Sequence, residues 1–154
     1  MRWLPVLAVV SITMSATAHA GLLPDGGVTA QDVASVLRAK GYQADITTDK
    51  EGDPLVRSNS SGAKFGVFFY ECKGKPRCKS IQFSAGFNEP GLDPAKIADW
   101  NRRNRFGRAW IDKDGDPFVE MDVDVEHGAT VEALANNLDR WVSVMGAFMR
   151  YLGR

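Results

Sequence analysis

Hydrophobic residues recur at helical spacing in three segments of the chain, residues 29–41, 93–107 and 130–152. The first segment begins with Thr29 and Asp32 in a Thr-x-x-Asp arrangement that approximates a capping box. The second opens on an Asp-Pro pair, a capping side chain followed by proline at the first helical position. Both segments close on a glycine, and the third carries a broad apolar stripe. The pattern predicts three helices.

Four strands are expected between the first two helices. Residues 42–48 and 55–58 flank an Asp-Lys-Glu-Gly-Asp-Pro turn and predict a hairpin. Residues 65–70 are apolar on both faces, which is typical of a central strand that is covered on at least one side. Residues 81–87 alternate apolar and polar side chains, so this strand should have one face in water.

Residues 108–112 and 118–125 form the clearest hairpin in the sequence. Its second strand is apolar on one face and acidic on the other. The apolar set is Val119, Met121, Val123 and Val125, and the acidic set is Glu120, Asp122, Asp124 and Glu126. The whole pattern predicts an α+β fold in which three helices pack on an antiparallel sheet of five or six strands, in the order α-β-β-β-β-α-β-β-α.

The N-terminus has the features of a secretory signal peptide. One cation, Arg2, precedes an apolar run too short to span a bilayer, and the run closes on an Ala-His-Ala motif. We expect residues 1–20 to be cleaved after that motif, residues 21–28 to form a flexible N-terminus and residues 29–154 to fold as one domain. No later apolar stretch approaches about 20 residues, so we expect a periplasmic or secreted protein without stable membrane insertion.

The chain has two cysteines, Cys72 and Cys78. An exported protein meets an oxidising compartment, so we expect them to form a disulfide. Closing so short a loop should stabilise the fold by about 2 to 3 kcal/mol through the unfolded chain. Two thiols with no histidine nearby cannot complete a tetrahedral zinc site, which makes a metal role the weaker interpretation.

Overall charge does not identify a partner. The chain has 19 basic and 19 acidic residues, and with export this argues against binding to nucleic acid. Cations and indoles are nevertheless concentrated between residues 100 and 110. The candidates there for binding a ligand or partner are Arg102, Arg103, Arg105, Arg108 and Trp110. An anionic small ligand or an anionic segment of a partner would suit such a set.

The acidic face of residues 120–126 has three interpretations. It is most simply the water-facing side of an antiparallel strand. It is alternatively a recognition surface for a basic partner, or it is neutralised inside the domain by cations from neighbouring elements. The cations considered for that pairing are Arg102, Arg103, Arg105 and Arg108.

The turn of the last hairpin resembles a calcium loop only in part. Asp112, Asp114 and Asp116 alternate as calcium ligands do, but Gly115 is the fourth position rather than the sixth, and Val123 replaces the glutamate of position twelve. We therefore expect a solvated turn and no metal site.

The sequence offers little for catalysis. His127 is the one histidine after the predicted signal peptide, and neither a Gly-x-Ser-x-Gly elbow nor a His-Glu-x-x-His motif is present. Pairs of carboxylates on the acidic strand lack the burial that acid and base catalysis needs. We expect no enzymatic activity and no cofactor.

The apolar stripe of the last helix is wide. Trp141, Met145, Phe148 and Met149 need not all fit against one sheet, so they are candidates for a dimer seam or a groove. Full burial within the monomer is the alternative.

Four segments carry a resemblance to a known family, residues 101–109, 112–116, 118–125 and 127–130. They resemble the YbjN domain family, bacterial proteins described as sensory transduction regulators. The resemblance implies a fold like that of the class I type III secretion chaperones, with a tendency to dimerise and no catalytic residues to carry over.

Together these features predict a non-catalytic, exported binding or regulatory module that recognises a protein or peptide, with a homodimer as a further expectation. The alternative hypothesis is a sensor of a small anionic ligand that uses the region from Arg102 to Trp110.

Overall fold

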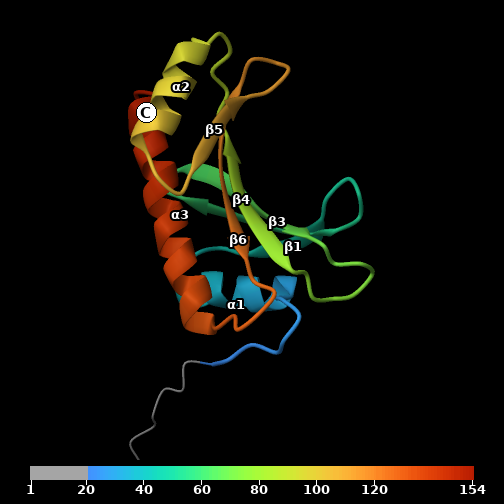
Figure 1. The fold of residues 1–154 in the computed structure, drawn as a ribbon. Coiled ribbons are helices and arrows are strands. Elements are labelled where there is room, and N and C mark those ends of the chain that lie inside the picture. The colour runs from blue at the N-terminus through green and yellow to red at the C-terminus, as the bar shows by residue number, and fades with distance from the viewer. Residues whose placement is uncertain (1–20) are drawn as a thin grey trace, which may run out of the picture.

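The computed structural model describes residues 21–154, and the predicted signal peptide lies outside the described residues. Three helices and six strands follow one another in the predicted order (Figure 1). Their bounds are α1 Ala30–Ala39, β1 Asp45–Thr48, β2 Pro54–Ser60, β3 Ala63–Tyr70, β4 Ser80–Gly86, α2 Pro94–Arg103, β5 Arg108–Ile111, β6 Pro117–Asp124 and α3 Val131–Tyr151. The α+β class predicted from the pattern is confirmed.

The six strands form one antiparallel sheet in the order β1-β2-β3-β4-β6-β5. The first four strands are consecutive neighbours. The chain then leaves the sheet through α2 and returns as β5 at the edge, and β6 inserts between β5 and β4. The acidic strand β6 is therefore an interior strand of the sheet.

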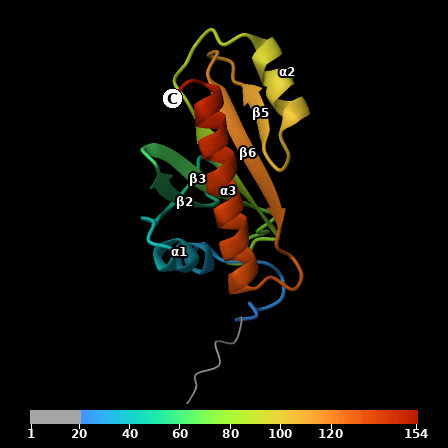
Figure 2. The ribbon, with the colours of Figure 1, turned by 90° about the vertical axis from the view of Figure 1, so that its left-hand side faces the viewer.

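All three helices lie on one side of the sheet (Figures 1 and 2). The 21-residue helix α3 runs along that face, with α1 near its N-terminal end and α2 near its C-terminal end. Caps fix the starts of these helices: the Asp32 backbone N–H donates to the Thr29 hydroxyl at 3.1 Å, and the Thr29 N–H donates to the Asp32 carboxylate at 2.9 Å. Among the described residues, no helix is long and apolar enough to cross a bilayer.

The core lies between α3 and the sheet. Trp141 is fully buried there, stacked on Phe83 at 5.7 Å between ring centroids and edge-on to Phe65 at 5.9 Å. Met145 and Phe148 are buried beside it. Three of the four side chains considered for a dimer seam or groove are thus inside the monomer, because the sheet is wide enough to cover the whole stripe. Met149 alone is half-buried.

Helix α2 is shorter than its pattern predicted. It ends at Arg103, with Asn104 as its C-cap in an extended conformation, whereas the glycine at position 107 was expected to end it. The Asn104 side chain donates to the Trp100 carbonyl at 3.0 Å, which closes the last turn. Gly107 instead passes so close to Val144 of α3 that a Cβ there would collide with it. That close approach, rather than a helix stop, accounts for this glycine.

The segment before α1, residues 21–28, was expected to be flexible. Its backbone forms hydrogen bonds at both ends: the Leu23 N–H donates to the carbonyl of Ala129 at 2.9 Å, and Val28 pairs with Cys78 in both directions. Gly27 has a φ of 106° and packs directly on the Cys78 carbonyl, where no side chain would fit. The predicted disulfide between Cys72 and Cys78 is present.

Candidate functional site on the open face of the sheet

The two faces of the sheet have very different surroundings. Strand register places alternate residues of every strand on the face that the helices cover, for example Val67 of β3, Phe83 of β4 and Met121 of β6, which pair across the sheet. The residues between them point to the other side, which none of the helices in residues 21–154 covers (Figure 1). We call this second side the open face.

The open face carries apolar side chains outside the helix-side core cluster, of which Leu55 is buried and Phe68 and Phe118 are half-buried. Leu55, Phe68, Trp110 and Phe118 all lie on it, and none of them is part of the helix-side core cluster. The Trp110 and Phe118 rings stack at 4.9 Å between centroids. A hollow of about 400 Å³ lies among these residues, with Leu55 and Phe68 on one side and Phe118 on the other. We call it the open-face hollow.

Two glycines form the floor of the open-face hollow. A Cβ on Gly66 would stand 2.9 Å from the Phe68 ring, and one on Gly86 would stand 2.5 Å from the Phe118 ring. The Phe68 ring lies over Gly66 of its own strand β3, and the Phe118 ring of β6 lies over Gly86 of the neighbouring strand β4, at points that a larger residue would block. Ser84, the other floor residue, is buried. Small residues under aromatic walls give the hollow depth on a surface that is otherwise a flat sheet.

The charges around the open-face hollow are not balanced. Arg57 and Lys64 line it, and in the described part of the chain neither forms an ion pair. On the β6 side, Glu120 is buried and accepts a hydrogen bond from Arg108 at 2.9 Å. Arg57 and Lys64 are therefore the charged side chains that line the hollow, and Asp45 lies opposite Arg57 in the register of β1 and β2.

The rest of the acidic stripe is satisfied within the domain. Asp122 accepts from the Gln82 amide at 2.8 Å, Asp124 accepts from the backbone N–H of Glu126 at 2.9 Å, and Glu126 pairs with Lys79. Internal pairing, one of the three interpretations of the acidic face, thus holds for Glu120 with Arg108.

Tyr70 of β3 also faces the open side. Partial burial and the charges of Glu120 and Asp122 raise its pKa.

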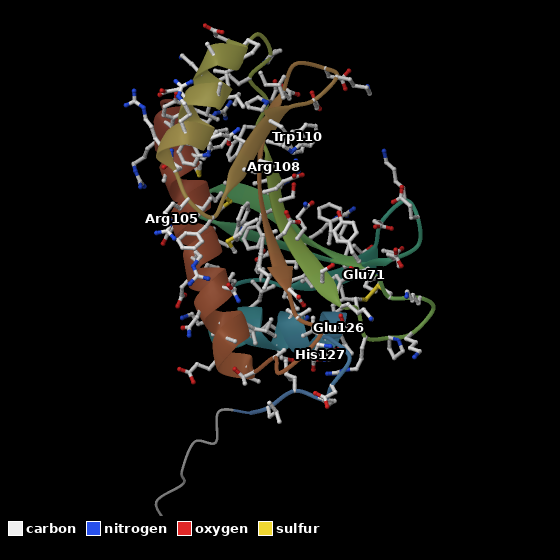
Figure 3. The ribbon with its side chains drawn as sticks, viewed as in Figure 1. Glu71, Arg105, Arg108, Trp110, Glu126 and His127 are labelled. Carbon is white, nitrogen blue, oxygen red and sulfur yellow. A yellow bond between two sulfur atoms is a disulfide. The ribbon has the colours of Figure 1, made fainter. Side chains whose placement is uncertain are left out.

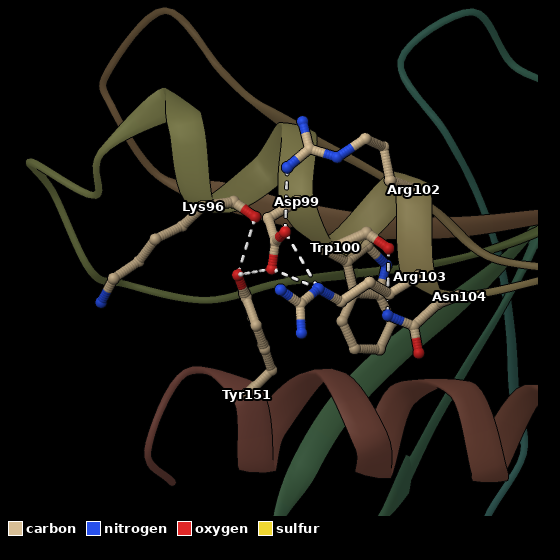
Figure 4. Close-up of polar contacts among 7 residues, drawn as sticks. All are labelled: Lys96, Asp99, Trp100, Arg102, Arg103, Asn104 and Tyr151. Atoms are coloured by element: carbon tan, nitrogen blue, oxygen red, sulfur yellow. Dashed lines mark hydrogen bonds and ion pairs between the residues drawn. The ribbon is translucent and has the colours of Figure 1, made fainter.

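Arg102 and Arg103 lie on α2, away from the open face. Both donate to the Asp99 carboxylate, at 2.9 and 3.0 Å, as Figure 4 shows. Partial burial disfavours ionisation of Asp99, but the two guanidinium groups outweigh it and lower its pKa. The Tyr151 hydroxyl donates to the Lys96 carbonyl at 3.0 Å and to Asp99 at 3.4 Å, so this network joins α2 to the end of α3.

The remaining candidate residues point in different directions (Figure 3). Arg105 lies beside α3, whereas Arg108 and Trp110 lie on β5 with their side chains on the open face. The structure does not gather the five candidates into one pocket. Only Arg108 and Trp110 contribute to the surface around the open-face hollow.

The acidic turn of the last hairpin is held by its own backbone hydrogen bonds. The Asp112 carboxylate accepts the backbone N–H groups of Asp114 and Asp116, both at 2.9 Å, as a tight turn requires. No group of three or more His, Cys, Asp or Glu in residues 21–154 is arranged to hold a metal ion. His127 is largely exposed at the junction between β6 and α3.

Sequence reasoning did not single out Leu55, Gly66, Phe68, Gly86 or Phe118. The signal was present in part, because residues 65–70 are apolar on both faces and only one face needs a helix cover. The position of β6 next to β4, which brings Phe118 over Gly86, is a long-range pairing that the local pattern does not contain.

Comparison with known proteins shows a fold that has been seen before. No curated protein matches the chain. One solved structure with a similar fold is the Yersinia pestis type III secretion chaperone SycH in complex with a stable fragment of YscM2. It has a TM-score of 0.50 and 15% sequence identity, over 74% of this chain and 93% of that chain. At this identity the similarity establishes the fold alone, which is the chaperone-like fold that the sequence resemblance implied.

The family model named YbjN, with the description "Putative bacterial sensory transduction regulator", matches residues 29–154. This match spans the whole described domain from the cap of α1 to the C-terminus, so the chain belongs to the YbjN family.

Proposed function

We propose that this protein is a non-catalytic binding module that recognises a segment of another protein on the open face of its sheet. The observation that carries the proposal is the open-face hollow, because aromatic walls over a floor of small residues, rimmed by polar side chains, are typical of a surface that binds a partner. Membership of a regulator family and the fold shared with a chaperone support a binding role.

The chemistry of the hollow favours one kind of segment. An apolar side chain would fill the space over Gly66 and Gly86, between the rings of Phe68 and Phe118. An acidic residue next to it would meet Arg57 or Lys64, neither of which forms an ion pair within the described residues. The acids of β6 have partners of their own, so they do not favour a basic segment.

We further propose that the protein works outside the cytoplasm, in the periplasm or secreted. The disulfide supports this location, because such bonds persist in oxidising compartments. The signal-like N-terminal residues 1–20 point the same way from the sequence alone. Proteomic identification of a mature N-terminus at Gly21 in an envelope or culture fraction is the direct check.

A homodimer remains part of the proposal, on a surface other than the one first considered. The outer side of β5 has no strand neighbour among the described residues, and Trp110 beside it is 36% exposed. Sedimentation equilibrium of the mature protein, compared with a Trp110→Ser variant, tests this. A dimer that is weakened by the substitution supports the β5 edge.

Retention of partners from an envelope extract tests the binding role. The mature protein and a Phe68→Ser/Phe118→Ser variant are immobilised side by side, with Val131→Ser as a matched control at an exposed apolar position on α3. We expect one or a few proteins to be retained by the wild type and the control and lost from the double variant. With the purified partner, the double variant should bind at least tenfold more weakly, or about 1.4 kcal/mol. Equal retention by all three proteins would contradict the proposal.

A further inference from the structure

A second hollow lies on the helix side of the sheet, where the loop after α2 meets the middle of α3. Its volume is about 410 Å³, and Trp100, Val144 and Ala147 supply much of its apolar lining. Arg105 and Arg140 also line it. We call it the helix-side hollow. It is on the other side of the sheet from the open-face hollow, so the inference below does not rest on the proposed function.

An exposed aromatic ring stands between two cations at the helix-side hollow. Phe106 is 58% exposed, and the guanidinium carbons of Arg105 and Arg140 lie 5.1 and 4.7 Å from its ring centroid. Both distances are within the range of a cation–π interaction. A guanidinium group that packs against a ring keeps the N–H groups of its edge available for an acceptor.

The backbone at Phe106 is strained. Its φ is 68°, a left-handed value that is uncommon for a bulky side chain. The neighbouring Gly107 is held against Val144 of α3, which fixes the path of the loop. Strained conformations persist only where the surroundings hold them, and they concentrate at ligand sites. With this backbone conformation the exposed Phe106 ring lies in the lining of the hollow.

Donors outnumber acceptors at the helix-side hollow. Arg105 has no hydrogen bond or ion pair in residues 21–154, and the side chain of Arg140 donates only to the amide oxygen of Asn137, at 2.7 Å. No acid lines this hollow within the described residues, and the acids of α2 and of the middle of α3 are engaged elsewhere: Asp99 pairs with the cations of α2, and Asp139 pairs with Lys40. The buried indole N–H of Trp100 also lacks an acceptor within the described residues.

We propose that the helix-side hollow binds a small planar carboxylate. The guanidinium groups of Arg105 and Arg140 hold the carboxylate oxygens, and the flat apolar body of the ligand packs against the Phe106 ring and the wall formed by Val144 and Ala147. The volume is within the range of small-molecule sites. A planar anion satisfies both features of the site, whereas an inorganic anion would use only the cations.

Titration of the mature, ¹⁵N-labelled protein with benzoate, followed by NMR, tests the proposal. We expect saturable shifts at millimolar or lower concentration, confined to residues 104–107 and 140–147 and to the side-chain Nε–H groups of Arg105 and Arg140. Cyclohexanecarboxylate has the charge without the planar body, and inorganic phosphate has the charge alone. Both should bind at least fivefold more weakly than benzoate.

Variants separate a specific site from general attraction by a basic surface. Arg105→Gln and Arg140→Gln should each weaken benzoate binding at least fivefold. Arg150→Gln is the matched control, because it removes the same charge from an exposed position on α3, the helix that carries Arg140. Phe106→Asn accepts the left-handed backbone and keeps the fold, and it should remove the preference for benzoate over cyclohexanecarboxylate.

Three results would overturn the inference. They are an absence of localised shifts up to the solubility limit of benzoate, a response to phosphate as strong as that to benzoate, and equal weakening by Arg150→Gln and Arg105→Gln. Phe118→Ser, on the open face, should leave benzoate binding unchanged, so failure of this site and failure of the proposed function are distinguishable.

Discussion

The two faces of one sheet show what a helix cover does to the same strands. On the covered face, Phe65 and Phe83 close around Trp141 and leave it no exposed surface. On the open face, Phe68 of β3 and Phe118 of β6 stand over glycines, and no helix of residues 21–154 covers them. The first arrangement buries its aromatic rings within the described chain, whereas the second leaves its rings partly exposed. The difference indicates that the covered face contributes most of the stability, and it motivates the proposal that a partner binds the open face.

The largest expected effect separates the two faces by their energetics. Trp141→Ala should lower the free energy of unfolding by about 3 to 5 kcal/mol, because it opens a cavity in the core. Phe118→Ala should cost no more than about 1 kcal/mol, mainly the stacking on Trp110. Urea denaturation of both variants measures this. Similar losses would mean that the open face is a structural part of the fold, and the comparison would fail.

Replacing the disulfide should have the next largest effect. A Cys72→Ser/Cys78→Ser variant should lose about 2 to 3 kcal/mol of stability, since a seven-residue loop is released in the unfolded chain. The disulfide joins the ends of β3 and β4 next to Tyr70 and Ser80, while the hollow lies at their other ends. Binding at the open face should therefore survive at temperatures where the variant is folded. A binding defect in the folded variant would show that the two ends of the hairpin are coupled.

A smaller effect is expected where the open face is charged. Arg108→Met should cost about 1 kcal/mol, because it leaves the buried Glu120 carboxylate with only a long contact, 3.5 Å, from Ser84. The addition of Glu120→Gln should recover most of that loss. Arg103→Met removes an exposed partner of Asp99 and should cost less than about 0.5 kcal/mol. Thermal or urea unfolding of the three proteins gives the ranking, and an Arg103 effect as large as that of Arg108 would refute it.

The smallest effect is a pH dependence at the end of the sheet furthest from the hollow. The hydrogen bond between Lys79 and Glu126 lowers the pKa of the carboxyl and raises the pKa of the amine. The contribution of Glu126 is therefore present above its unfolded pKa of about 4.3 and is lost as the pH falls through the lower folded value. The contribution of Lys79 to stability is lost only as the pH rises through the raised pKa of its amine. Glu126→Gln should show a shallower loss of Tm than the wild type between about pH 5 and pH 3, and parallel curves would contradict this.

Much of the fold follows from local patterns in the sequence. The order of the nine described elements, the capping box of α1 and the alternation of faces along β4 all depend on residues within one segment. The face of β4 expected in water is only partly so, because Ser84 is buried. The disulfide follows from the expected compartment. The end of α2 was misplaced because Gly107 is explained by its contact with Val144, more than thirty residues away in the chain.

The candidate sites were harder to predict for the same reason. Arg102 to Trp110 is one continuous cationic stretch in the sequence, but a helix end, a loop and a strand turn its side chains to different sides of the molecule. The open-face hollow combines β2, β3, β4 and β6, and only the pairing of β6 with β4 closes it. The local pattern identifies the aromatic residues, but it does not predict the strand pairing that brings them together.

Site-specific photo-crosslinking tests the central claim most directly. A benzophenone amino acid is placed at Phe68 on the open face, or at Val131 on α3, in the full chain produced in its native cells. The account predicts a discrete covalent adduct from position 68, none from position 131, and loss of the adduct when Phe118→Ser is added. Adducts from position 131 alone, or equally from both positions, would contradict it.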